Sequence, residues 1–247
     1  MSLVITLKDT TFSNPNLPTI PLDYPMDGIE ALYRMDTVIN GVLQDSSGNG
    51  KHAALYNSYL LGQKGIRLDD GYINTPISIN EDDITIFAVH RVDKVPVEAV
   101  LNDRFRFVWS FYPGLVGQVD QVYYSPSNDS WLFGGLFSSS SRVDANLAEE
   151  KWIFTCVSWA GGRYRYFCPE FGLSLDYGVS VKPVIESDCY FNIGQIGSQK
   201  PNTALKYGGF NGDIGVVGVY KKGKTTSQIM EIYKSAQIQM AKRGIVI

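Results

Sequence analysis

Short apolar or alternating runs recur along most of the chain, and turns that contain glycine separate them. The run "ITIFAVHRV" (residues 84–92) is apolar on both faces, which predicts a strand buried between two layers. In "RFRFVWSFY" (residues 104–112), Phe105, Phe107 and Trp109 share one face of an alternating pattern. Both runs therefore favour β-strands over helices.

The stretch "KGIRLDDGYINTP" (residues 64–76) has the pattern of a hairpin that turns at Asp70-Gly71. No helical pattern separates the strand-like runs, so a parallel sheet is disfavoured. The predicted fold is all-β, an antiparallel two-sheet β-sandwich (jelly roll) with an extended N-terminal arm and one C-terminal α-helix.

That helix is predicted in "TTSQIMEIYKSAQIQMAKRG" (residues 225–244). Thr225 and Gln228 have the spacing of a capping box, and Gly244 is placed to end the helix. One face is apolar, formed by Ile229, Ile232, Tyr233, Ala236 and Met240. We expect the helix to cover the sandwich; a dimerising helix is the alternative.

Residues 1–26 form the predicted arm, because "FSNPNLPTIPLDYP" carries four of the 11 prolines. The predicted division is an arm (residues 1–26), a sandwich (residues 27–224) and a helical segment (residues 225–247). Such an arm packs on its own domain or on a neighbour. It predicts a homo-oligomer, or attachment to another protein.

Charge and composition narrow the function classes. Charged residues are 19% of the chain and the net charge is −3, which argues against nucleic-acid binding. No apolar run is long enough to cross a membrane, so no membrane insertion is expected. The start "MSLVITLKDTT" lacks a signal-peptide pattern. The cysteines Cys156, Cys168 and Cys189 form no CxxC pair, which predicts reduced, buried thiols and no zinc site.

Three segments together resemble the concanavalin A-like lectin/glucanase superfamily, in its laminin-G-like and pentraxin-like branch. They are "DSSGNGKHAAL" (residues 45–55), "KWIFTCVSWAGGRYRYFCPEFG" (residues 151–172) and "FNGDIGVVGVYKKGKTTSQIMEIY" (residues 210–233). The resemblance implies a lectin-like jelly roll. Domains of this kind are frequent in virion and tail proteins of bacteriophages, so we expect a phage protein located in the virion.

The known catalytic motifs that we considered each lack a required catalytic residue in this sequence. Glucanases of the superfamily carry E-x-D-x-x-E, but "EDDITI" (residues 81–86) has Ile86 at the third acidic position. There is no G-x-S-x-G motif. His52 and His90 are the only histidines. We expect His52 to hydrogen-bond the opening turn and His90 to be packed in a strand. The sequence therefore predicts no catalytic residues and no enzyme.

Calcium is the one cofactor left open, because Asp45, Asn49, Asp69, Asp70 and Asp213 offer hard oxygen ligands. The loop "DSSGNG" (residues 45–50) lacks the D-x-D-x-D rhythm of a calcium loop. Hydrogen bonds within the turn are therefore the expected role of Asp45 and Asn49. Asp69, Asp70 and Asp213 remain the weaker calcium candidates.

Carbohydrate binding needs exposed aromatic faces beside amides or carboxylates. The turn region "QVDQVYYSPSNDSWLFGG" (residues 118–135) supplies the candidate set Tyr123, Tyr124, Asn128, Asp129 and Trp131. The alternative is that these aromatic side chains point into the core. The predicted function is a non-enzymatic structural or receptor-binding component of a phage particle, with a cell-surface glycan as its candidate ligand. The alternatives are a glycan-active hydrolase and a capsid decoration protein without a ligand.

Overall fold

A computed structural model describes residues 23–78, 83–93, 106–111, 120–125, 130–135, 138–144, 150–178, 190–195 and 210–247 of the chain. The strands are β1 (Ile29–Tyr33), β2 (Val38–Ile39), β3 (Val42–Leu43), β4 (Ala53–Gly62), β5 (Gly65–Ser78), β6 (Ile84–Val92), β7 (Arg106–Phe111), β8 (Asp120–Ser125), β9 (Ser130–Gly135), β10 (Ser138–Asp144), β11 (Ile153–Ala160), β12 (Arg163–Cys168), β13 (Leu173–Gly178), β14 (Tyr190–Ile193) and β15 (Phe210–Tyr220). A short 3-10 turn, η2 (Pro169–Phe171), follows β12, and one α-helix, α1 (Thr226–Ala241), follows β15 in the described part of the chain.

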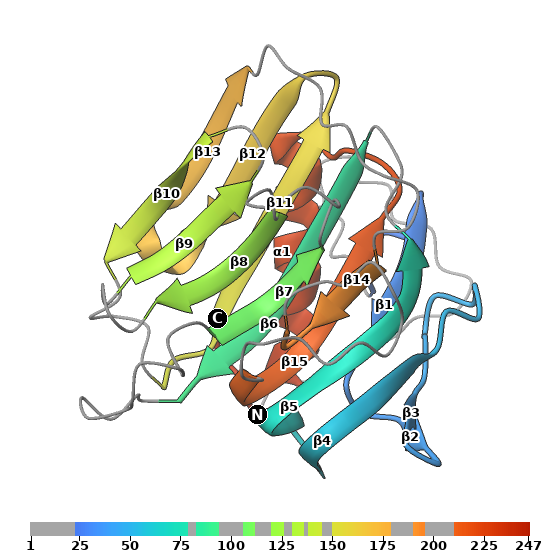
Figure 1. Ribbon diagram of the computed structural model, residues 1–247. Coiled ribbons are helices and arrows are strands. Elements are labelled where there is room, and N and C mark those ends of the chain that lie inside the picture. The colour runs from blue at the N-terminus through green and yellow to red at the C-terminus, as the bar shows by residue number, and fades with distance from the viewer. Residues whose placement is uncertain are drawn as a thin grey trace, which may run out of the picture.

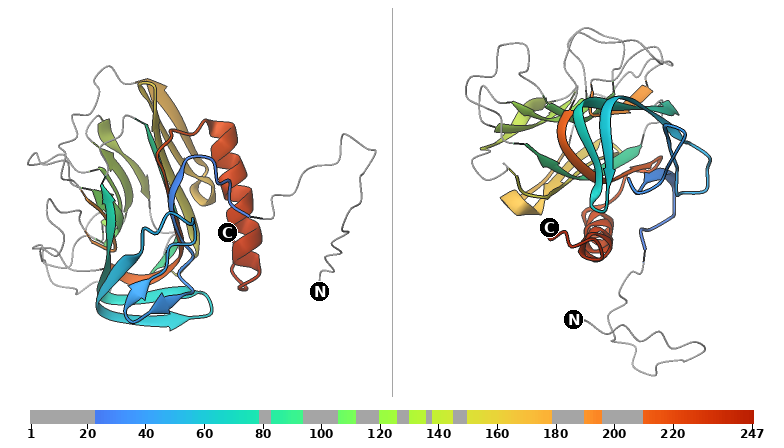
Figure 2. Two further views of the ribbon diagram at one scale, coloured as in Figure 1. Left: turned by 90° about the vertical axis from the view of Figure 1, so that its right-hand side faces the viewer. Right: turned by 90° about the horizontal axis from the view of Figure 1, so that it is seen from below.

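The strands form two layers that share β5 (Figure 1). We call β10-β9-β8-β7-β14-β5 the front layer and β5-β15-β6-β11-β12-β13 the back layer. The pairings between described strands are antiparallel, for example β6 with β11 and β15 with β6. Helix α1 lies against the side of the back layer that faces away from the front layer (Figure 2). The predicted antiparallel sandwich with one C-terminal helix is therefore confirmed.

Two apolar cores hold these layers together. The first lies between the sheets and contains Trp109, Ile214 and Val217. The second lies between the back layer and α1 and contains Phe87, Phe154 and Ile232. Strand β6 contributes to both, because its alternate side chains point to opposite faces. This confirms the prediction that residues 84–92 form a strand buried between two layers.

The β4–β5 hairpin turns at a different place from the one predicted. Gly62 pairs with Gly65 at its end, whereas Asp70-Gly71 lies inside the continuous strand β5. The register skips at this point, since Tyr56 pairs with Tyr72 but Ser58 pairs with Asp69. Asp70 has a φ of 52° and Asn57 on β4 has a φ of 60°. Positive φ, which Asp-Gly supplies readily, forms a β-bulge here instead of a turn.

The bulge lets β5 belong to both layers. Before it, Ile66 to Gly71 pair with β15; after it, Ile73 to Ser78 pair with β14. A Cβ at Gly71 would lie 2.5 Å from the Ser58 carbonyl oxygen, so only glycine permits this close approach. The bulge therefore closes one side of the sandwich.

Helix α1 begins with the predicted capping box between Thr225 and Gln228. Its apolar side chains, Ile229, Ile232, Ala236 and Met240, are buried as predicted. Gly244 follows with a φ of 71° and Arg243 donates to the carbonyl oxygens of Arg34 (2.7 Å) and Gly215 (3.0 Å). The helix therefore covers the sandwich.

The predicted arm lies mostly outside the described residues, which begin at Asp23. One of its last residues, Tyr24, is part of the second core. Tyr24 stacks on Phe87 with ring centroids 5.3 Å apart, and Ser235 of α1 donates to the Asp23 carbonyl oxygen at 3.0 Å. Within the described ranges, no helix combines the length and apolar character that crossing a membrane requires.

Candidate functional site

The opening loop is held together by Asp45. Its carboxylate accepts hydrogen bonds from the backbone N–H groups of Leu32 (3.0 Å), Ser47 (2.8 Å) and Lys51 (3.0 Å), and from Ser47 Oγ (2.8 Å). Burial raises the pKa of Asp45, but these hydrogen bonds outweigh it and the pKa is lowered overall. Asn49 donates to the carbonyl oxygens of Ile29 (2.9 Å) and Glu30 (3.2 Å). The predicted structural role of Asp45 and Asn49 is confirmed.

Both histidines also have the predicted structural roles. His52 Nδ1 accepts a hydrogen bond from the Asp45 backbone N–H at 3.1 Å. His90 is fully buried in β6, and its Nε2 lies 3.3 Å from Thr155 Oγ1. Burial lowers the pKa of His90 to about 3, so the ring is neutral at physiological pH.

Among the three weaker calcium candidates, Asp213 has different surroundings from the adjacent residues Asp69 and Asp70. Asp213 accepts from Arg91 Nε at 2.8 Å and from Arg67 Nη1 at 3.4 Å, while Asp69 and Asp70 are exposed. In the part of the chain that the structure describes, no group of three or more His, Cys, Asp or Glu side chains could hold a metal ion. Calcium binding at these carboxylates gains no support and stays a prediction.

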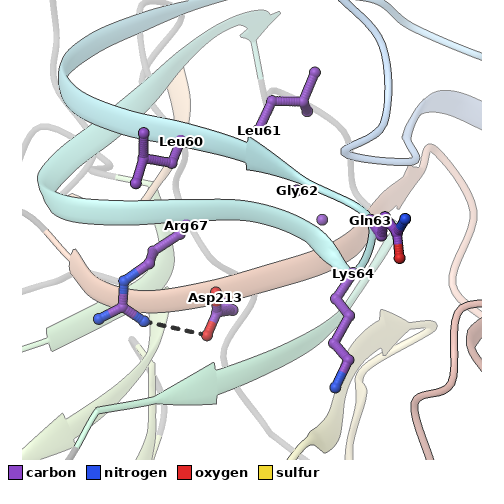
Figure 3. A pocket seen from close by; sticks show the side chains of 8 residues that line it. Leu60, Leu61, Gly62, Gln63, Lys64, Arg67 and Asp213 are labelled. Carbon is purple, nitrogen blue, oxygen red and sulfur yellow. Dashed lines mark hydrogen bonds and ion pairs between the residues drawn. The ribbon is translucent and has the colours of Figure 1, made fainter.

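Asp213 also borders the cavity shown in Figure 3, which has a volume of about 280 Å³. The end of the β4–β5 hairpin forms its wall, with Leu60 and Leu61 exposed by 69% and 48%. Arg67 at its edge is bound by Asp93, with Nη2 2.6 Å from Oδ2. The Arg67 guanidinium is thus already paired with carboxylates, which leaves this side chain poorly placed to bind an anion in the cavity.

The predicted sugar-contacting residues are only partly described. Tyr123 and Tyr124 lie on β8 and Trp131 lies on β9, and Tyr124 pairs with Trp131 across the hairpin. Asn128 and Asp129 lie outside the described residues. The hairpin itself agrees with the prediction, whereas glycan contact by these five residues stays a prediction.

A second aromatic group, which the sequence analysis missed, lies on the β4–β5 hairpin. Tyr56 and Tyr72 are half-buried and stack on each other, with ring centroids 5.0 Å apart and an angle of 12° between the planes. Leu68 and Ile73 point into the core between the sheets, so their neighbours Asp69 and Tyr72 point away from it. The exposed residues Asn57, Asp69 and Asp70 flank the rings. We call Tyr56, Asn57, Asp69, Asp70 and Tyr72 the tyrosine patch.

A row of polar residues continues from the patch across the front layer. Asn74 is two residues beyond Tyr72 on β5, and it pairs with Asn192 on β14, which pairs with Ser110 on β7. The adjacent residues Ile73, Ile193 and Trp109 point into the core, so the row faces away from it. All three polar side chains are buried, and Ser110 Oγ has no hydrogen-bond partner within the described structure.

The patch is acidic. Asp69 and Asp70 bring two carboxylates to it, and Arg67, which is two residues before Asp69 on β5, is paired with Asp93 and Asp213 and also attracts the Asp69 carboxylate. Burial raises the pKa of Tyr72, so its hydroxyl stays protonated and can donate a hydrogen bond. Aromatic faces, hydroxyls, an amide and carboxylates are thus gathered at one accessible place.

Comparisons with known proteins identify the fold and no family. Neither protein-family models nor curated proteins gave a match. Among solved structures, Trypanosoma rangeli sialidase in complex with sialic acid has a TM-score of 0.66 at 14% identity, over 89% of this chain and 35% of the sialidase. A mutant of that sialidase with trans-sialidase activity has a TM-score of 0.64 at 14% identity, over 87% and 34%. This chain spans about a third of the length of these sialidases.

A third structure is matched over nearly its whole length. Domain 4 of a GH43 extracellular arabinanase from Geobacillus stearothermophilus, in complex with arabinotriose, has a TM-score of 0.52 at 17% identity, over 83% of this chain and 97% of that domain. The predicted antiparallel β-sandwich is confirmed at the level of the fold. None of these three matches supports a phage origin, which stays a prediction.

The prediction that the chain is not an enzyme is wrong, because it excluded an activity that chains with this fold can have. It rested on missing catalytic motifs, but the same fold is part of chains that are sialidases. The correction is a limited one, because 14% identity over about a third of each sialidase assigns no reaction to this chain.

Proposed function

We propose that this chain is a glycan-binding β-sandwich module that contacts its ligand through the tyrosine patch. The observation that carries the proposal is the stacked pair Tyr56–Tyr72, which is accessible and flanked by amide and carboxylate groups. Ligand sites typically combine aromatic surface with a few polar groups that fix orientation. Tyrosine suits this role because it offers an apolar ring with a polar end.

Two further observations support the proposal. The polar row begins beside the patch and includes Ser110 Oγ, a buried hydroxyl without a partner in the described structure. Buried polar groups are usually hydrogen-bonded, so this hydroxyl calls for a partner, and a ligand or an ordered water is such a partner. In addition, the arabinanase domain with nearly the same extent was solved with arabinotriose.

A glycan array, read with and without a calcium chelator, tests the proposed glycan binding. We expect binding that survives the chelator and is lost in Tyr72→Ala. Tyr72→Phe keeps the ring and should retain most of the affinity, and thermal unfolding checks that both variants are folded. An array without any bound glycan would refute the proposal. Loss of binding in the presence of the chelator would show that binding depends on calcium.

Glycan cleavage is a second candidate, favoured by the sialidase matches. Incubation with sialyllactose separates the two candidates, because release of free sialic acid indicates hydrolysis and binding alone does not.

Assembly through residues 1–26 and a place in a virion remain proposals from the sequence. Sedimentation of the full chain and of a chain starting at Asp23 tests the first. We expect the full chain to form oligomers and the shortened chain to be smaller, and equal masses would contradict it. This boundary keeps Asp23 and Tyr24, which pack against α1 and Phe87.

A further inference from the structure

We propose that the outer edge of β4, at residues 58–62, binds residues 3–7 of a second copy of this chain as an additional β-strand. This inference rests on the proposed assembly through residues 1–26 and adds the surface that receives the arm. In β-strand addition, main-chain hydrogen bonds to an open sheet edge supply affinity, and pockets for alternate side chains supply specificity.

The outer edge of β4 is open toward the end of the β4–β5 hairpin. One side of residues 58–62 is paired with β5 up to the hairpin end. On the other side, β3 pairs only with Ala53 and Ala54, at the opposite end of β4, and no further described strand pairs with β4 (Figure 1). The backbone N–H and C=O groups along such an edge can hydrogen-bond to another strand.

This edge lacks the protection that open edges usually carry. Soluble proteins commonly place charged side chains or proline there, which prevents pairing with another chain. Residues 58–62, "SYLLG", follow the bulge and contain neither, and Leu60 and Leu61 are exposed by 69% and 48%. Both leucines line the cavity of about 280 Å³ in Figure 3, which offers room for a side chain of the added strand. These features are typical of an edge that pairs with another strand.

Residues 3–7, "LVITL", are the segment of this chain that fits the edge. They match the open stretch of β4 in length and carry no charge, and the β-branched residues Val4, Ile5 and Thr6 favour a strand. Because both segments are uncharged and contain leucine, their pairing would remove apolar surface of both from water.

The residues between this segment and the described chain favour a second copy as its source. Residues 8–22 lead to Asp23, where the described chain begins, and they carry a proline at every third position (Pro15, Pro18 and Pro21). This spacing favours extended polyproline II, which at about 3.1 Å per residue spans roughly 45 Å here. A domain of this size has a radius of gyration of only about 17 Å. A stiff spacer of that length directs residues 3–7 away from their own domain.

Sedimentation of full-length variants tests the docking surface. Leu60→Lys and Leu61→Lys place a charge where the added strand would desolvate it, so each should weaken self-association about tenfold. Leu175→Lys is the matched control, because Leu175 is an exposed leucine on β13, the last strand of the back layer in the described structure. The control should leave self-association unchanged, and thermal unfolding checks that all three variants are folded.

Disulfide cross-linking tests which segment occupies the edge, and in which copy. Cys189→Ser provides the background, in which Cys156 and Cys168 are buried. One tagged chain carries Leu60→Cys, and a second, differently tagged chain carries Val4→Cys, Ile5→Cys or Thr6→Cys. Opposite residues on antiparallel strands have Cα atoms about 4.5–5.5 Å apart, a distance that a disulfide spans. At least one of the three mixtures should form a disulfide that joins both tags, whereas Leu175→Cys in place of Leu60→Cys should form none.

The outcomes separate this inference from the assembly on which it rests. If the full chain is a monomer, both the assembly and docking on β4 are refuted. If self-association needs residues 1–22 but is unchanged in the Leu60 and Leu61 variants, or if no mixed disulfide forms, docking on β4 is refuted while assembly through the arm stands. A disulfide that forms only when both cysteines are in one chain refutes the second copy as the source of the strand.

Discussion

Substitution of Asp45 by asparagine should strongly destabilise the sandwich. The carboxylate accepts four hydrogen bonds from Leu32, Ser47 and Lys51, and the residue is only 9% exposed. Asparagine keeps one oxygen and replaces the other with an NH2 group, which cannot accept the two hydrogen bonds that the replaced oxygen accepted. Two of the four bonds are lost, which costs about 3–6 kcal/mol at 1.5–3 kcal/mol for each charged hydrogen bond.

Thermal and urea unfolding measure this loss at pH 7. For a chain of this size, each kcal/mol lowers the melting temperature by about 2–4 °C, so Asp45→Asn should melt about 10 °C lower. Asp36→Asn is the control, because the exposed Asp36 carboxylate accepts from Thr37 Oγ1 (3.0 Å) and pairs with Arg243 (2.9 Å) at the surface, so the substitution should cost less than about 1 kcal/mol.

The pH dependence gives an independent check. Because the folded pKa of Asp45 is lowered, its stabilisation is present above the unfolded pKa of about 3.9 and is lost as pH falls through the folded value. The gap between wild type and Asp45→Asn should therefore narrow in acid. A melting temperature within about 1 °C of wild type at pH 7 would refute the reasoning.

Three further outcomes follow from the structure. The free energy of unfolding should fall as pH drops from about 6.5 toward 3, because burial lowers the pKa of His90 to about 3. In His90→Gln, the free energy of unfolding measured in urea should depend less on pH over this range, and an unchanged pH dependence would contradict this. In a Cys189→Ser variant, the buried Cys156 and Cys168 should react with a thiol reagent only after unfolding, since burial raises the pKa of both thiols; rapid labelling of the folded protein would argue otherwise. Thr225→Ala should cost about 1 kcal/mol in urea unfolding through loss of the capping box, and no change would show that the cap is dispensable.

Much of the fold could be predicted because its signals are local. The capping box needs only Thr225 and Gln228, and the apolar face of α1 needs only the spacing of Ile229 and Ile232. Strand β6 is apolar on both faces, and a position between two cores is the arrangement that buries both. The turn held by Asp45 is likewise specified within a few residues.

The bulge at Asp70-Gly71 could not be predicted in this way. The Asp-Gly pair indicates only that the chain can adopt a positive φ at this point, and both a turn and a β-bulge use a positive φ. The choice is made by residues far away in sequence. Phe210 of β15 pairs with Gly71, and the Asp70 backbone N–H donates to Asn211 Oδ1, so β5 is held extended on both sides of the bulge.

The candidate site depends on that same bulge, which explains why the sequence favoured Tyr123, Tyr124 and Trp131 instead. Tyr56 and Tyr72 are separated along the chain by the whole hairpin, and only the register places them opposite each other. A regular hairpin continuing from the Ser58–Asp69 pair would set Tyr56 against Gly71, because each step along β4 is matched by one step along β5. The extra residue in β5 shifts this partner by one and brings Tyr72 onto Tyr56. In the sequence this bulge is visible only as an Asp-Gly pair that fits a turn equally well. In the structure the bulge creates both the bend of β5 between the layers and the aromatic surface beside that bend.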